Sequence, residues 1–238
     1  MKDMKTIKAA LCIFAVMCLA SCGSTRYAGS SSGTKISDIQ EFAFLKPCAY
    51  MILYDTDGGY YNQNNTDIAT EVITNVINSE RFPFTDVLEA DYQGEDNDTF
   101  EWVQNLMDIK QNQVSRLRVP KSLLKRLASV DNRYGILIYS RGYNMTQEAY
   151  DKERVEKTAS KVIDTAAEKL IGIRGLTNPS QSYIPSDPYR NRMVCIVIDK
   201  EDQRVIYYAK EDPTFASHPK DRDDVSTLLH KLLKDFIR

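Results

Sequence analysis

Short apolar runs alternate with amphipathic segments along most of the chain, and this alternation constrains the fold more than any other feature. Apolar runs of about five residues suit buried strands, whereas apolar residues spaced by three and four positions form one face of a helix. The predicted strands are the apolar runs 49–54, 135–139, 193–198 and 204–209, and a further candidate at 86–90. The amphipathic segments are 66–77, 98–107, 120–130, 147–171 and 225–236.

Strands that are apolar along their whole length need helices on at least one face of their sheet. The order of the segments therefore predicts an α/β fold: a single two-layer or three-layer sandwich of about five strands, with a C-terminal hairpin and helix. The hairpin turn is predicted at 199–203. In the last strand Tyr207 and Tyr208 point to opposite faces, so one of them is expected to be exposed.

Composition and charge exclude several functional classes. The 238 residues are 42% hydrophobic and 27% charged, which suits one sizeable core and not a disordered chain. The 31 basic residues against 33 acidic ones give a net charge of -2, so we expect no nucleic-acid partner. The sequence has no glycine-rich phosphate loop, no CxxC and only two histidines, so we expect no cofactor and no Cys/His zinc site.

The N-terminal residues have the pattern of a secretion signal. Three lysines within the first eight residues precede the uncharged apolar stretch Ala9–Ala20. A helix of this length is too short to cross a bilayer core of about 30 Å, so the segment is a cleavable signal rather than a membrane span. Leu19-Ala20-Ser21-Cys22 resembles the lipobox of bacterial lipoproteins, in which the chain is cut before the cysteine and the thiol is acylated. The alternative is an ordinary signal peptide with an incidental cysteine.

The lipobox resemblance implies a lipid anchor, such as palmitate, on Cys22 and attachment to a membrane without spanning it. We expect residues 1–21 to be the signal peptide and residues 22–40 to be the lipidated cysteine with a flexible Gly/Ser/Thr-rich tether. Residues 41–238 are expected to form a single α/β domain. Because no acidic residue directly follows Cys22, we predict the periplasmic face of the outer membrane.

Two cysteines other than Cys22 remain in the processed chain, Cys48 and Cys195. The oxidising environment of the envelope permits a disulfide between them. The alternative is a pair of buried thiols, which the apolar run around Cys195 favours.

The segment Asp55-Thr56-Asp57-Gly58 follows an apolar strand and resembles the first motif of haloacid-dehalogenase-type phosphatases. The resemblance implies that Asp55 is a nucleophile, that Asp57 is an acid/base, and that Asp55 and Asp199 hold Mg²⁺. Asp and Gly after a strand are also what an ordinary turn requires. A Mg²⁺-dependent phosphohydrolase is therefore the alternative function.

A second resemblance covers most of the chain. A helix opened by Val119-Pro120-Lys121, a strand ending in Arg141-Gly142-Tyr143, and the hairpin over 196–208 follow one another in this order. This order looks like that of envelope lipoproteins of the CsgG, LpoB and TolB-N-terminal type. The resemblance implies a non-catalytic module that binds or assembles other envelope proteins.

The predicted partner site is the stretch from Leu176 to Arg192, which has no hydrophobic period and is longer than most connections in α/β folds. Its apolar and aromatic anchors are Tyr183, Ile184 and Tyr189, and Arg190 and Arg192 add bidentate donors. The alternative is a solvated connecting loop.

Overall fold

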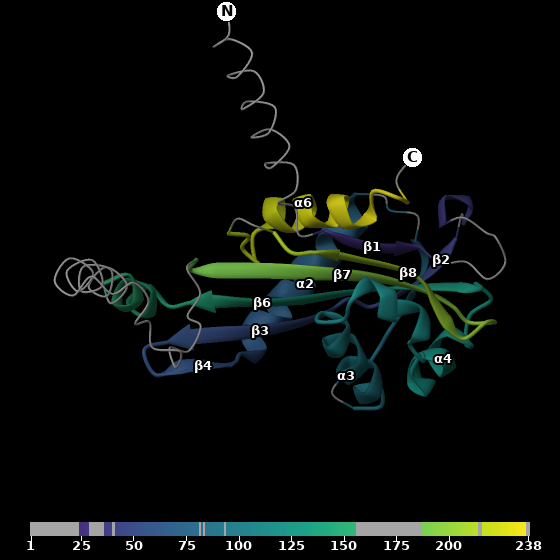
Figure 1. Cartoon of the computed structure of the whole chain (residues 1–238), viewed down its shortest axis with the longest axis horizontal. Helices are drawn as coiled ribbons and strands as arrows, with labels where there is room; N and C mark the ends of the chain where they lie inside the picture. Colours follow the sequence, from purple (N-terminus) through teal and green to yellow (C-terminus); the bar gives the residue numbers. More distant parts are fainter. Residues whose placement is uncertain are drawn as a thin grey trace, which may run out of the picture.

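The computed structural model describes residues 24–28, 36–39, 41–80, 82, 84–92, 94–155, 187–213 and 216–236 (Figure 1). Its strands are β1 (Thr25–Ala28), β2 (Phe42–Leu45), β3 (Cys48–Asp55), β4 (Gly58–Tyr61), β5 (Phe84–Leu88), β6 (Tyr134–Met145), β7 (Tyr189–Asp199) and β8 (Arg204–Glu211). Its helices are α2 (Gln63–Ser79), α3 (Asn97–Leu106), α4 (Lys121–Leu127) and α6 (Arg222–Leu233), with 3₁₀ helices η1 (Ile36–Asp38) and η2 (Gln111–Arg116). Residues 147–155 are also helical.

The described strands join one open sheet whose main order is β1-β8-β7-β6-β2-β5. Strand β6 is central: it is antiparallel to β7 along most of its length and parallel to β2 and β3 on its other side. Strand β2 pairs with the start of β6, and β3 pairs with its second half. The next row outward is also divided, because β5 pairs with β2 whereas β4 pairs with β3.

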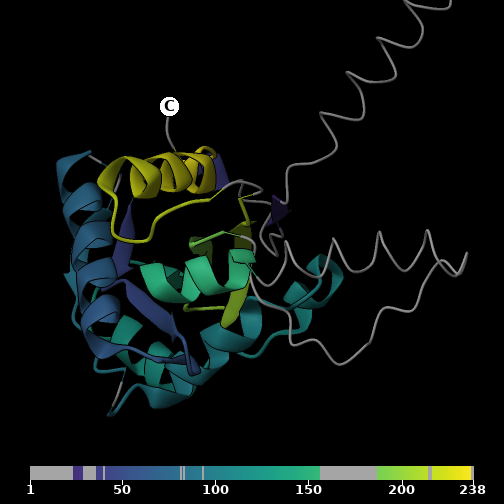
Figure 2. The ribbon, with the colours of Figure 1, turned by 90° about the vertical axis from the view of Figure 1, so that its left-hand side faces the viewer.

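Helices cover both faces of this sheet, which gives a three-layer sandwich (Figures 1 and 2). Helices α2 and α6 pack on one face, where Ile73 and Leu229 are fully buried. Helices α3 and α4, with η2, pack on the other face around Leu127. Alternation along each strand supplies both cores, so Val197 belongs to the first and its neighbour Ile196 to the second. Within the described part of the chain, no helix combines the length and hydropathy needed to cross a membrane.

The starts of the helices follow from their capping residues. The side chain of Asn62 accepts a hydrogen bond from the backbone N–H of Asn65 and caps α2. Thr66, which the sequence suggests as the cap, lies inside α2, where its hydroxyl donates to the carbonyl of Asn62. Asp221 caps α6 by accepting from two backbone N–H groups of the first turn. Pro120 directly precedes α4, as predicted.

The predicted fold class is confirmed, with eight described strands in place of about five. The additional strands β1, β2 and β4 each have four residues, too few to show a hydrophobic period. Strand β1 also corrects the prediction of a flexible tether over 22–40, because residues 25–28 pair with β8 at the edge of the sheet. Residues 36–38 of the same stretch form η1.

The expectation that either Tyr207 or Tyr208 is exposed is wrong. The two side chains do point to opposite faces, but both faces are covered, and their exposed fractions are 1% and 0%. Each phenol has a hydrogen-bond partner: Tyr207 donates to Asp235 at 2.7 Å and Tyr208 donates to the carbonyl of Leu106 at 2.8 Å.

Two valines on strands provide a matched test of the double-sided core. Val197 on β7 is fully buried, whereas 60% of Val87 on β5 is exposed. Both Val→Ala changes lose the same β-branched side chain, so their difference isolates burial. We expect Val197→Ala to lower the free energy of unfolding by about 2 kcal/mol more than Val87→Ala does, measured by urea denaturation. Equal losses would contradict this arrangement of the core.

Candidate functional site

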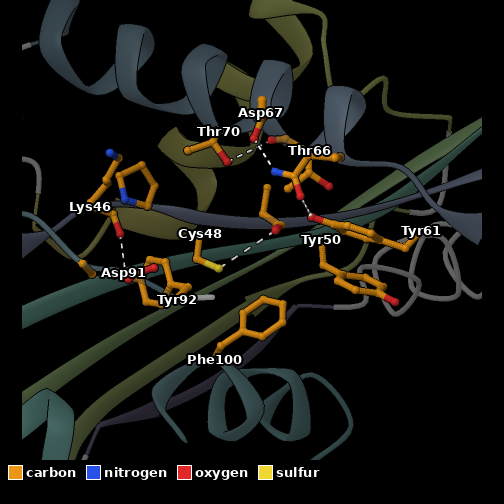
Figure 3. Close-up of a pocket in the computed structure, with 14 residues that line it drawn as sticks. Lys46, Cys48, Tyr50, Tyr61, Thr66, Asp67, Thr70, Asp91, Tyr92 and Phe100 are labelled. Atoms are coloured by element: carbon orange, nitrogen blue, oxygen red, sulfur yellow. Dashed lines mark hydrogen bonds between the residues drawn. The ribbon is translucent and has the colours of Figure 1, made fainter. Parts of the chain in front are cut away.

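A pocket of about 480 Å³ opens where the strand row beside β6 is divided (Figure 3). Its walls come from the β2–β3 junction, from β4, from the first turns of α2, from the segment after β5, and from α3. The lining residues are Lys46, Pro47, Cys48, Ala49, Tyr50, Tyr61, Gln63, Thr66, Asp67, Thr70, Ala90, Asp91, Tyr92 and Phe100.

The floor of the pocket is a stretch of β3 that has no strand on its outer side. On the outer side of β3, pairing with β4 begins only at Ile52. Earlier in the chain, the last hydrogen bond to β5 runs from the N–H of Lys46 to the carbonyl of Leu88. The backbone of Met51 turns away from β6, because its N–H donates to Thr66 Oγ1 and its carbonyl accepts from the N–H of Asn62. Since strand residues alternate, the N–H and carbonyl of Ala49 also point outward, into the pocket.

Aromatic rings form one wall of the pocket. Tyr50 and Tyr61 are stacked, with ring centroids 5.0 Å apart and planes 26° apart. Phe100 of α3 lies on the same side of the strand as Tyr50 in Figure 3, with its centroid 6.1 Å from that of Tyr50. Tyr61 is 39% exposed, so this wall reaches from the interior to solvent.

Polar side chains form the opposite wall, along α2. The hydroxyl of Tyr61 donates to Gln63 Oε1 at 2.7 Å, and Gln63 Nε2 donates to Asp67 Oδ1 at 2.7 Å. Thr70 lies one turn farther along α2 and donates to the carbonyl of Thr66 at 2.9 Å. This chain of hydrogen bonds fixes the direction in which the amide and the carboxylate face the pocket.

Two buried groups in the pocket, the Cys48 thiol and the Tyr92 phenol, are held in their protonated forms. Burial raises the pKa of the Cys48 thiol far above its ordinary value, so no thiolate nucleophile is present at neutral pH. Burial, followed by the nearby Cys48 and Asp96, also raises the pKa of Tyr92, whose hydroxyl donates to the carbonyl of Lys46 at 2.7 Å. Lys46 itself pairs with Glu89 at 2.8 Å.

The predicted phosphatase site does not assemble. Asp55 and Asp57 lie at the β3–β4 turn, where Asp55 Oδ1 accepts from the N–H groups of Asp57 and Gly58 at 2.8 and 3.1 Å. Tyr54, beside Asp55, is opposite Met145 at the end of β6, whereas Asp199 is opposite Tyr134 at its start. Eleven residues of strand correspond to about 36 Å. The Mg²⁺-phosphohydrolase hypothesis is therefore wrong, and the Asp55 motif is a turn motif.

Asp199, the proposed metal ligand, forms an ion pair instead. Its carboxylate accepts a bidentate pair of hydrogen bonds from Arg133, the shorter at 2.7 Å, although the carboxylate is only 2% exposed. Burial would raise the pKa of Asp199, but the hydrogen bonds from Arg133 and from the backbone N–H groups of Asp202 and Glu201 outweigh it and lower the pKa. Among the described residues, no group of three His, Cys, Asp or Glu side chains could hold a metal ion.

The disulfide alternative for Cys48 and Cys195 is also wrong. Both cysteines are free and buried. Cys195 belongs to the core under α2 and α6, and Cys48 belongs to the core on the opposite face of the sheet. Strand β6 lies between the two, since Cys48 pairs with Tyr139 and Cys195 pairs with Ile138. The two sulfur atoms therefore cannot meet.

The partner loop predicted over Leu176 to Arg192 ends earlier than expected, because β7 already begins at Tyr189. Tyr189, Arg190 and Arg192 lie in β7, where they pair with the end of β6. Arg190 and Arg192 both form ion pairs with Asp212, at 2.5 and 3.1 Å. The ring of Tyr189 packs against His218 with centroids 4.6 Å apart. Tyr183, Ile184 and the lipidation residue Cys22 lie outside the described residues.

Sequence reasoning missed the pocket, although one of its signals was visible. Tyr60 and Tyr61 stand out as adjacent tyrosines after a turn. Only Tyr61 lines the pocket, and the other lining residues come from segments up to 54 positions apart, from Lys46 to Phe100, which only the order of the strands brings together.

Comparisons with known proteins give weak structural similarities. No family model matches the sequence, and no curated protein matches it. The chain is similar to the PelC dodecamer from Paraburkholderia phytofirmans, with 11% identity and a TM-score of 0.39 over 90% of this chain and 95% of that one. It is also similar to a DUF4136 family protein from Bacteroides thetaiotaomicron, with 9% identity and a TM-score of 0.29 over 89% and 93% of the two chains.

The Asp199–Arg133 pair gives a pH-dependent prediction. A carboxylate whose pKa is lowered by folding contributes stability above its unfolded pKa of about 3.9, and this contribution is lost as the pH falls through the folded value. We expect Asp199→Asn to lower the free energy of unfolding by about 1–3 kcal/mol at pH 7, and by less near pH 3. Urea denaturation at several pH values measures both.

Glu201→Gln is the matched control for this experiment, because Glu201 also pairs with Arg133 but is 60% exposed. Its effect is expected to stay below about 0.5 kcal/mol at every pH. A loss for Asp199→Asn that does not change with pH would contradict the lowered pKa.

Proposed function

We propose that this protein is a lipid-anchored, non-catalytic binding module of the bacterial cell envelope. In this proposal Cys22 carries the lipid, the folded part lies on the periplasmic face of the outer membrane, and the ligands are other components of the envelope. The observation that carries the proposal is the position of β1, which begins three residues after Cys22.

The position of β1 is compatible with cleavage before Cys22. Strand β1 begins after Cys22, so cleavage before Cys22 would leave β1 in the processed chain. The first strand residue, Thr25, pairs with Lys210 of β8, and the register continues to Ala28 opposite Tyr207. A chain of three residues spans about 11 Å at most. An acyl group on Cys22 would therefore hold the sheet close to the membrane surface.

Hydrogen bonds of the Arg26 side chain connect β1 to β8 and α6. Its guanidinium donates to Tyr207 Oη and to the carboxylate of Glu211, both at 2.8 Å. It also donates to the backbone carbonyls of Lys231 and Leu232 in the last turn of α6. These carbonyls carry the negative end of the helix dipole, so a cation is stabilising there. The backbone carbonyl of Arg26 in turn accepts from Gln111 of η2.

The proposal of binding rather than catalysis rests on the pocket chemistry. The Cys48 thiol and the Tyr92 phenol are buried in protonated form, and Asp199 lies at the other end of β6 from Asp55. Partners among envelope proteins remain a proposal, with the stretch before β7, including Tyr183 and Ile184, as the expected contact.

Lipidation at Cys22 is tested by Cys22→Ala in cells fed a labelled fatty acid. The variant is expected to lose the label and to leave the membrane fraction, because the thiol that carries the acyl chains is missing. Cys48→Ala, which removes a buried thiol elsewhere, is expected to keep the label. Label on the Cys22→Ala protein would overturn the anchor.

The docking of β1 is tested by Arg26→Ala. The change removes every hydrogen bond of the guanidinium, and hydrogen bonds to charged groups contribute about 1.5–3 kcal/mol each. We therefore expect limited proteolysis of membranes to release the folded domain from the variant at least about tenfold faster. Arg222→Ala is the control, because Arg222 is exposed and its guanidinium donates to the hydroxyl of Ser79 in α2, a different element from β1. Equal release rates would show that β1 is not held by Arg26.

A further inference from the structure

We infer that the pocket beside β3 binds a neutral saccharide. Three properties of the pocket carry this inference: a supported aromatic platform, fixed hydrogen-bonding groups beside it, and an uncharged floor. The inference goes beyond the proposed anchor and does not depend on lipidation of Cys22.

The platform is the ring of Tyr61. One face of this ring is supported by Tyr50, at 5.0 Å between centroids, and Tyr50 in turn contacts Phe100 at 6.1 Å. The ring is 39% exposed, and it is held at its hydroxyl by Gln63. A sugar ring has an apolar face of C–H groups and an edge of hydroxyls, and a rigid aromatic ring covers such a face at a small entropic cost.

The hydroxyl edge of the sugar would meet the polar wall along α2. The relay from Tyr61 to Gln63 to Asp67 uses Asp67 Oδ1, and it orients the carboxylate beside the platform. An ionised carboxylate accepts several hydrogen bonds, and bonds from hydroxyls to it are short and strong. Because these groups are already oriented, little ordering is needed when a ligand binds.

The floor of the pocket favours a neutral ligand over a charged one. Cys48, Ala49 and Thr66 are 4%, 4% and 8% exposed and none of them is charged. A charged group that reached the floor would lose its water without gaining an opposite charge. The carbonyl of Ala49 already accepts from Cys48 Sγ at 3.9 Å, and the backbone N–H of Ala49 can donate to one hydroxyl.

The charges lie at the rim of the pocket. Asp67 and Asp91 are exposed, so they repel anions, and the one lysine of the lining, Lys46, is paired with Glu89. The volume of about 480 Å³ is typical of small-molecule pockets, which span about 300–1,000 Å³. Size and charge together fit one or two uncharged sugar rings.

The test uses the full chain, purified in a polyoxyethylene detergent because maltoside and glucoside detergents carry sugars. Isothermal titration is run with maltotriose, cellotriose and triacetylchitotriose as neutral probes, and with trilysine and trigalacturonic acid as charged probes of similar size. We expect at least one neutral trisaccharide to bind with a Kd below about 1 mM, and neither charged probe to bind.

Substitutions of two neighbouring tyrosines distinguish binding in the pocket from non-specific binding to the protein surface. Tyr61→Ala should weaken binding by about tenfold or more, as expected for a central aromatic contact. Tyr60→Ala removes a tyrosine that is 48% exposed on the same strand but does not line the pocket, and it should leave the Kd unchanged. Asp67→Ala should weaken binding with no loss of thermal stability.

Several outcomes would overturn the inference. They are failure of all three neutral probes to bind at about 10 mM, tighter binding of trilysine than of every saccharide, or equal losses for Tyr60→Ala and Tyr61→Ala. Fatty-acid labelling of the same preparations reports separately on the lipid anchor.

Discussion

Burial of β6 on every side is the constraint on which the rest of the structure depends. The strand is paired along both edges, and its side chains alternate between two cores, with Ile136 and Ile138 in one and Leu137 and Tyr139 in the other. A strand in this position requires helices on both faces of the sheet. Packing also specifies Gly142, one of the two glycines of β6, because a Cβ there would collide with the carbonyl oxygen of Arg190 on β7.

The elements that could be predicted from the sequence are those whose pattern is long enough to have a period. The runs that became β3, β6, β7 and β8 were visible because they are apolar over several consecutive residues. Helix α6 was visible because Val225, Leu228, Leu229, Leu232 and Leu233 recur on one face, and all five are buried. Strand β1 was hidden because Thr25 to Ala28 is polar in composition, and its place in the sheet depends on contacts of Arg26 with residues more than 180 positions away.

The pocket could not be predicted for the same kind of reason. It exists because the row beside β6 is shared by β2 and β3, and because β5 and β4 do not meet in the next row. No local pattern encodes such a gap. The phosphatase motif was a false prediction, because each aspartate has a structural role that explains its presence. Asp55 stabilises a turn, and Asp199 forms an ion pair with Arg133.

The strand order also places β1 and the pocket in different parts of the sheet. Strand β1 lies at one margin of the sheet, and four strand spacings separate it from β3, where the pocket begins. At about 4.8 Å per spacing this is about 19 Å. If Cys22 carries the proposed acyl chains, three residues before β1, this distance would separate the pocket from the lipid anchor. A saccharide could then reach the pocket without having to pass between the protein and the lipid.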